Sequence, residues 1–84
     1  MSPSAPGFSV LKARKLRTLL ERKLGYQLAG NKGGSHRKYR HATRPPVTLA
    51  FHDGDEIGPA LVRDILVKQV GLTIDEAKEV VKRA

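Results

Sequence analysis

The 84-residue sequence contains no cysteine and no tryptophan, and its only aromatic residues are two tyrosines and two phenylalanines. Without cysteine the chain can form neither a disulfide scaffold nor a thiolate metal site, which fits a reducing compartment, and we expect a cytoplasmic protein. No apolar run approaches the ~20 residues that a membrane span requires. Residues 1–8 also lack the apolar core of a signal peptide.

Acidic residues are scarce in the first half of the chain. Sixteen Lys and Arg residues against eight Asp and Glu residues leave a net charge of +8, and every acid except Glu21 lies at Asp53 or beyond. This imbalance favours a polyanionic partner, with nucleic acid first and an anionic membrane second. A merely solubilising surface is the alternative. The membrane is the weakest of these readings, because the basic residues 9–24 lack interfacial aromatic anchors.

Hydrophobic spacing predicts an α+β fold in which the elements follow the order α-β-β-β-α-α. Three helices are expected over residues 9–24, 59–70 and 74–82. Three short strands are expected over residues 26–29, 36–41 and 47–51, with turns at 30–35 and 43–46. These strands should form a three-stranded antiparallel sheet covered on one face by the helices. Residues 1–8 are expected to be a disordered lead-in to a single domain over 9–84.

The same spacing predicts which residues form the core. In the helices these are Leu16, Leu19, Leu20, Leu24, Ile57, Leu61, Ile65, Leu66, Val70, Ile74, Ala77, Val80 and Val81, and in the outer strands Tyr26, Leu28, Val47, Leu49 and Phe51. Glycines end the first two helices at Gly25 and Gly71. Thr73 and Glu76 have the spacing of a capping box at the start of the third helix.

Alternation along the middle strand separates its polar residues onto two faces. Tyr39 is the only large apolar side chain there, so its face, shared with Arg37 and His41, should point inward. The opposite and open face should then carry His36, Lys38 and Arg40. The glycine-rich stretch before this strand, residues 30–35, lacks the Gly-Lys-Ser/Thr ending of a phosphate-binding loop and reads most simply as a hairpin turn.

His36 is the strongest candidate for chemistry because histidine exchanges protons near neutral pH and cations surround this one. No acid lies near it in sequence to build a triad, and no second histidine has a metal-ligand spacing, so we expect neither metal nor cofactor. General acid–base work on a phosphodiester remains. In RNA the 2′-hydroxyl already supplies the nucleophile, so one histidine and a basic face suffice.

A second polar cluster follows the third strand. His52 is interpreted as a turn or capping residue in preference to a second catalyst. Asp53 and Asp55 have the carboxylates of a cation site, but acids are also expected at a helix entrance, where they interact favourably with the helix dipole. The basic face of the first helix fits an RNA-backbone contact and a solvated surface equally well.

The order of these features resembles the HicA family of toxins over about residues 16–79. The resemblance rests on Gly25-Tyr26 after the first helix, on Gly34-Ser35-His36 with Tyr39 three residues on, on a proline-bearing turn, on a strand ending at His52, and on a Gly-Pro-opened helix that reads Leu61-Val62-Arg63-Asp64-Ile65-Leu66. One departure is the additional glycine, Gly33, before the usual Gly-Ser-His.

The resemblance implies a small RNA-cleaving, growth-inhibiting toxin with a fold like that of double-stranded-RNA-binding domains and an extra C-terminal helix. It implies that His36 is the catalytic residue and that a HicB-like antitoxin covers the site in a hetero-oligomeric complex. The residues expected to contact RNA around His36 are Lys32, Gly34, Ser35, Arg37, Lys38 and Arg40. The resemblance and the residues together predict a metal-independent endoribonuclease that cleaves mRNA. The alternative is a non-catalytic RNA-binding module that uses the same basic face.

Overall fold

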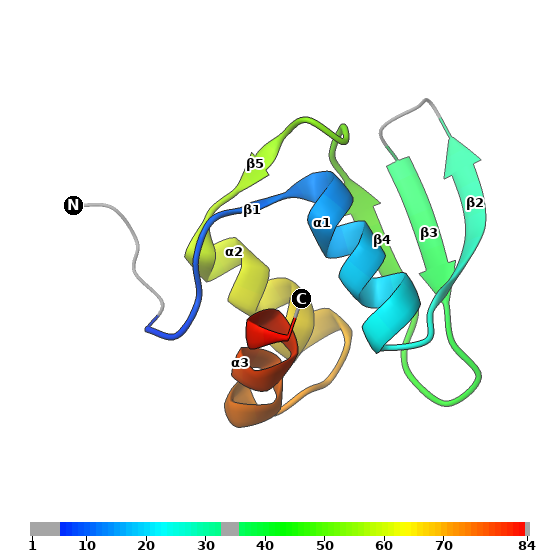
Figure 1. Cartoon of the computed structure of the whole chain (residues 1–84). Helices are drawn as coiled ribbons and strands as arrows, with labels where there is room; N and C mark the ends of the chain where they lie inside the picture. Colours follow the sequence, from blue (N-terminus) through cyan, green and yellow to red (C-terminus); the bar gives the residue numbers. More distant parts are fainter. Residues whose placement is uncertain (1–5, 33–35, 84) are drawn as a thin grey trace.

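The computed structural model describes residues 6–32 and 36–83 and has the expected α+β architecture. Figure 1 shows the helices gathered on one side of a three-stranded sheet. The elements are β1 (Leu11–Lys12), α1 (Ala13–Thr18), η1 (Leu19–Lys23), β2 (Gln27–Lys32), β3 (His36–Arg40), β4 (Val47–Ala50), β5 (Glu56–Ile57), α2 (Pro59–Asp64), η2 (Ile65–Gln69) and α3 (Ile74–Lys82). The segments η1 and η2 are π-helical turns that continue α1 and α2. Residues 1–5 of the predicted lead-in lie outside the described residues.

The first helix begins later than predicted. Leu11 and Lys12 are extended and pair with β5 in a two-stranded antiparallel ribbon, in which Leu11 lies opposite Ile57. The first helical amide, that of Ala13, donates to the carbonyl of Asp55 at 2.8 Å. The predicted start at Ser9 is therefore wrong, because this long-range pairing holds residues 11–12 extended. The predicted end is confirmed, since Gly25 has a φ of 77°.

The three-stranded sheet has the order β2-β3-β4 and is antiparallel throughout. Tyr39 of the central strand lies opposite Leu28 on one side and Val47 on the other. The strand limits differ slightly from those predicted: β2 continues through residues 30–32, which were predicted as turn, and residues 41 and 51 lie outside β3 and β4. Residues 33–35 lie outside the described residues.

One predicted core position in the sheet is wrong. Leu28 lies opposite the buried Tyr39 and so belongs to the helix-covered face, yet its side chain is 44% exposed. Leu28 is on the predicted face of the sheet, but its strand is too far from the helices to be covered by them. β2 is the edge strand that lies farthest from the helices in Figure 1. The remaining predicted sheet residues are buried, except Phe51, which is half-buried against the core.

The second helix starts with Gly58 as its cap and Pro59 as its first residue, as its sequence predicted. Its buried stripe is Val62, Ile65, Leu66 and Val70. Leu61 was predicted to be in this stripe, but it is one position away from it and is 43% exposed. The prediction for Leu61 is therefore wrong, because the helix is rotated so that Val62 faces the core instead.

The third helix begins with the predicted capping box. The Thr73 hydroxyl accepts from the amide of Glu76 at 3.1 Å, and the Glu76 carboxylate accepts from the amide of Thr73 at 2.9 Å. Ala77 is buried, and Val80 and Val81 pack against the core, as predicted. Ile74 was predicted inward, but it is 51% exposed, whereas Leu72, which precedes the helix, is buried.

Candidate active site

The two faces of β3 differ in the way that strand alternation predicted. His36, Lys38 and Arg40 are exposed, whereas Arg37 is half-buried and Tyr39 is fully buried. The helices cover the face that carries Tyr39, so the exposed residues belong to the open face of the sheet. An imidazole and two cationic side chains are thus displayed together on a rigid central strand.

The open face is hollowed around His36. The sheet-face hollow, of about 180 Å³, is lined by Gly30, His36, Lys38 and Thr48, one or two residues from each strand. Lys38 is the register partner of both Gly30 and Thr48, so these residues form one row across the sheet. A Cβ added to Gly30 would meet no atom within 4 Å. The missing side chain of Gly30 therefore helps to open the hollow beside His36.

The covered side of β3 is fixed by an ion-pair network that sequence reasoning missed. One oxygen of Asp53, Oδ1, accepts from Arg17 Nη1 at 2.6 Å and from Arg37 Nη1 at 2.8 Å. Arg17 Nε also donates to the Tyr39 hydroxyl at 2.8 Å. The first helix, the central strand and the turn after β4 are thereby joined through side chains. In the sequence, only the alternation of Arg37 with His36 indicated that the Arg37 side chain would lie on the covered face.

The network also sets the ionisation of its members. The hydrogen bond from Arg17 holds the pKa of the Asp53 carboxyl below its ordinary value; desolvation opposes this shift, and the hydrogen bond from Arg37 adds to it. Burial raises the pKa of the Tyr39 hydroxyl above its ordinary value, although the hydrogen bond from Arg17 opposes this shift. Asp53 is therefore a charged acceptor, and Tyr39 a neutral one, across the neutral pH range.

Asp53 and Asp55 do not act at the entrance of the second helix, where they were predicted to interact with a helix dipole. The strand β5 separates them from α2, and the first turn of α2 contains no acid. Their backbone carbonyls instead accept from the first amides of α1, those of Arg14 and Ala13. The Asp55 carboxylate accepts from the amide of His52, which lies exposed after β4, as expected for a turn residue.

Two kinds of residue remain from the sequence predictions: other predicted RNA contacts, and His41, which was predicted to face inward. Lys32 is the last residue of β2, and its backbone lies opposite that of His36. Gly34 and Ser35 lie outside the described residues. His41 is half-buried, its ring centroid is 5.0 Å from that of Tyr26, and its Nδ1 accepts from the amide of Thr43. These contacts of His41 are structural and lie in the turn between β3 and β4.

Within residues 6–32 and 36–83, no group of three or more His, Asp or Glu residues is arranged to hold a metal ion. No helix there has the length and apolar character required to cross a membrane.

Comparison with known proteins identifies the family. A family model described as "HicA toxin of bacterial toxin-antitoxin" matches residues 13–72, which include α1, the whole three-stranded sheet and the second helix. No curated protein and no solved structure shows a significant match. The matched region contains His36, the sheet-face hollow and the Asp53 network, and it covers most of the chain. The chain therefore belongs to the HicA family of toxins of bacterial toxin–antitoxin systems.

Proposed function

We propose that this toxin is an endoribonuclease that cleaves mRNA on the open face of its sheet, with His36 as the general acid–base residue. One observation carries the proposal: in a member of the HicA toxin family, an exposed imidazole lies beside Lys38 in a hollow on the open face of the sheet. The excess of cations on the chain supports a polyanionic substrate.

The proposed reaction requires little from the protein. The ribose 2′-oxygen attacks the adjacent phosphorus, and the bond from that phosphorus to the 5′-oxygen of the next nucleotide breaks. The imidazole of His36 takes the proton of the 2′-hydroxyl. The departing 5′-oxygen takes a proton from water, and the His36 imidazolium then returns its proton to the hydroxide that remains. The products are a 2′,3′-cyclic phosphate and a 5′-hydroxyl end. The ammonium of Lys38 would stabilise the charge that develops on the phosphate oxygens.

The remaining residues have supporting roles in this proposal. Lys32, Gly34, Ser35 and Arg40 would bind the RNA backbone around the scissile phosphate. Arg37 would contribute to the same basic surface mainly as a positioning residue, because its guanidinium pairs with Asp53 on the covered side. This ion pair holds β3 in place directly beside His36.

The antitoxin partner is proposed to be HicB-like, with an acidic surface that covers His36. The net charge of +8 suits such a surface, and charge complementarity should make association fast and sensitive to salt. The test is RNA cleavage by the purified complex. A complex that continues to cleave RNA, with His36 accessible, would contradict this part of the proposal.

The cleavage mechanism is tested by digesting RNA in excess chelator with the parent protein, His36→Ala and His52→Ala. The last is a matched control, because His52 is also exposed but lies in the turn after β4. We expect the parent and the control to leave 2′,3′-cyclic phosphate ends. His36→Ala should lose cleavage by about 10²- to 10⁴-fold, while Lys38 and Arg40 preserve RNA binding.

Four results would decide against the mechanism. Strict dependence on added magnesium, or 5′-phosphate products, would contradict metal-independent attack by the 2′-hydroxyl. Cleavage by His36→Ala at the parental rate would remove His36 from the reaction. Binding without cleavage by the parent protein would favour a non-catalytic RNA-binding module.

A further inference from the structure

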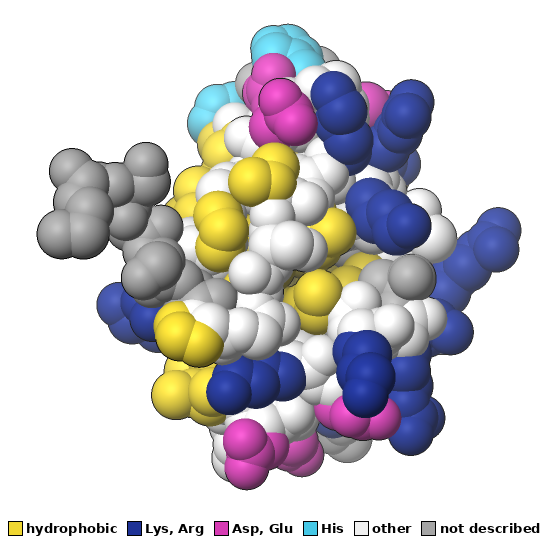
Figure 2. Space-filling view, turned by 60° about the vertical axis from the view of Figure 1, so that its left-hand side comes forward, with side chains coloured by type: hydrophobic (Ala, Val, Ile, Leu, Met, Phe, Trp, Pro, Cys, Tyr) yellow, Lys and Arg dark blue, Asp and Glu magenta, His cyan; other side chains and the backbone are white. Residues whose placement is uncertain are grey.

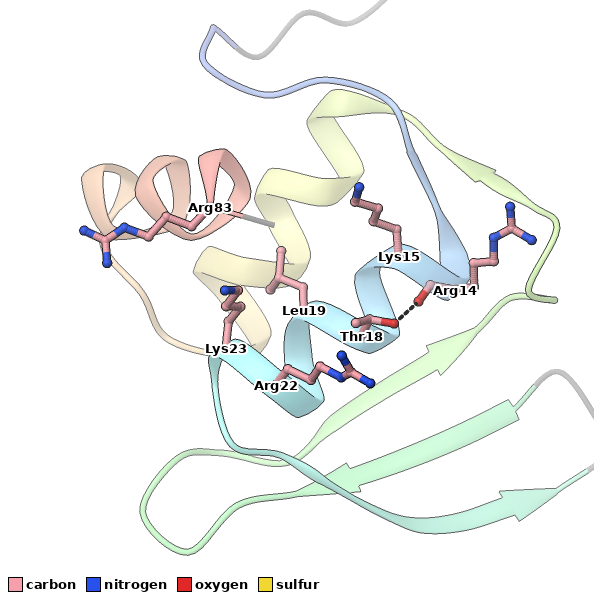
Figure 3. A pocket seen from close by; sticks show the side chains of 7 residues that line it. All are labelled: Arg14, Lys15, Thr18, Leu19, Arg22, Lys23 and Arg83. Atoms are coloured by element: carbon pink, nitrogen blue, oxygen red, sulfur yellow. Dashed lines mark hydrogen bonds between the residues drawn. The ribbon is translucent and has the colours of Figure 1, made fainter.

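A second cationic surface lies on the helical side of the molecule, away from the open face that carries His36. The cationic groove, of about 510 Å³, is lined by Arg14, Lys15, Arg22, Lys23 and Arg83 around the buried Leu19. Figure 3 shows that all of these side chains come from α1 and η1 except Arg83, which comes from the end of α3. In Figure 2 most of the visible Lys and Arg side chains gather on the right-hand side of the view.

Most of the charge in the cationic groove is uncompensated. Within the described residues, the exposed side chains of Arg14, Lys15, Arg22 and Lys23 form no ion pair or hydrogen bond, and only Arg83 pairs with an acid, Glu79. No carboxylate is among the residues that line the groove. Arg17, on the same helix, points elsewhere and pairs with Asp53. Uncompensated charges of one sign on the same surface repel one another, and a bound polyanion would relieve that repulsion.

The length of the groove suits a nucleic-acid strand. Residues 14–23 follow one helix, and at about 1.5 Å of rise per residue they extend over about 14 Å. Phosphates of a stacked strand recur about every 3.4 Å along its axis, so the row of cations would follow about four nucleotides. The guanidinium groups of Arg14 and Arg22, one near each end of the row, match the geometry of phosphate oxygens.

The groove begins near the end of the sheet that carries His36. The amide of Arg14 donates to the Asp53 carbonyl at 3.2 Å, and the Asp53 carboxylate accepts from Arg37, the residue after His36. Arg14 is therefore separated from the catalytic strand by one turn of chain. A strand of RNA that leaves the open face over this turn would meet Arg14 first and then continue along the helix.

We propose that the cationic groove is a second RNA-binding site, which holds the phosphate backbone of the segment flanking the nucleotides bound at His36. The continuity from His36 to Arg14 rests on the proposed function, but binding by the groove does not require cleavage. The groove would lengthen the RNA footprint beyond the open face. It would make longer substrates bind more tightly and leave the chemical step unchanged.

Binding is tested in the non-cleaving His36→Ala background with a single-stranded RNA of about 12 nucleotides, long enough to span both faces. The groove variant is Arg22→Gln with Lys23→Gln. The control, Arg63→Gln with Lys68→Gln, makes the same change in net charge on α2 and η2, where both cations already pair with Asp64. Fluorescence anisotropy over a range of salt concentrations gives the affinity, and thermal melting checks the fold.

We expect the groove variant to lower the slope of log K against log salt by about 1.4, since each phosphate contact in a single strand contributes about 0.7. The control should leave the slope unchanged. In the cleaving protein, the groove variant should raise KM for the long RNA at unchanged kcat and have no effect on a tetranucleotide. Equal slope changes in both variants, or none in the groove variant, would overturn the proposal.

Two further outcomes distinguish RNA binding from binding of an acidic protein, and the groove proposal from the proposed nuclease function. If polyglutamate binds the parent but not the groove variant, while the RNA slope is unaffected, the groove serves an acidic protein segment and the proposal fails. If no protein cleaves RNA but the groove variant still loses the expected slope, the groove proposal stands and the proposed nuclease function fails.

Discussion

Two alanine substitutions three residues apart in β3 should differ greatly in their cost to stability. His36 is exposed on the open face, and its side chain forms no hydrogen bond or ion pair within the described residues. Tyr39 has no exposed surface, and its hydroxyl accepts from Arg17. His36→Ala therefore removes a solvated side chain, whereas Tyr39→Ala removes a ring from the centre of the core.

The magnitudes follow from these environments. An exposed substitution changes stability by within about 0.5 kcal/mol, which for a domain of this size shifts Tm by at most about 4 °C. Removal of a buried aromatic ring costs about 3–5 kcal/mol, or at least about 12 °C in Tm. The whole domain is expected to have only about 4–13 kcal/mol of stability, so Tyr39→Ala should remove a large fraction of it.

A third variant separates the ring from its hydroxyl. Tyr39→Phe keeps the ring, and Arg17 keeps its partner Asp53, so the loss should be about 1 kcal/mol for one hydrogen bond. The assay is thermal melting of the isolated toxin followed by circular dichroism, with RNA cleavage measured on the same samples. Early melting of His36→Ala would show that His36 is a core residue and that the assignment of the two faces is wrong. Near-parental melting of Tyr39→Ala would refute the packing argument.

Three further predictions concern acid stability, the helix cap and the hollow. The pKa of the Asp53 carboxyl is lowered by its paired arginines, and that of the Glu76 carboxyl by the Thr73 backbone amide. Each carboxylate therefore stabilises the fold above its ordinary pKa, 3.8 for Asp53 and 4.5 for Glu76. This stabilisation is lost as the pH falls through the lowered pKa of the folded state. Tm should thus fall below about pH 4, less steeply in Asp53→Asn, and an unchanged acid limb would contradict the network. Thr73→Ala should cost about 1 kcal/mol in a urea melt, since it breaks the capping box, whereas no loss would show that the cap is dispensable. Gly30→Val should fill the sheet-face hollow and reduce RNA cleavage with little change in Tm, and full activity would exclude the hollow from substrate binding.

Short-range patterns in the sequence were enough to predict the helices, the start of α3 and the two faces of the central strand. The spacing of leucines and valines predicted the helices, and the Thr73–Glu76 pair predicted the start of α3, because both depend on hydrogen bonds and side-chain periods within a few residues. Strand alternation was enough to place His36 and Lys38 on the open face and Tyr39 inside. The Gly-Ser-His motif, in its order among these elements, pointed to the toxin family that the family match confirms.

Only the tertiary structure decided the features that depend on contacts distant in sequence. Pairing of residues 11–12 with β5 moved the start of the first helix, and the edge position of β2 left Leu28 exposed. Asp53 meets Arg17 and Arg37 only after the chain has folded, since these residues are 36 and 16 positions away from it. The cationic groove likewise needs Arg83 beside the first helix. The spacing of residue types along the sequence describes one helix or strand at a time, whereas these contacts depend on how the helices and strands pack together.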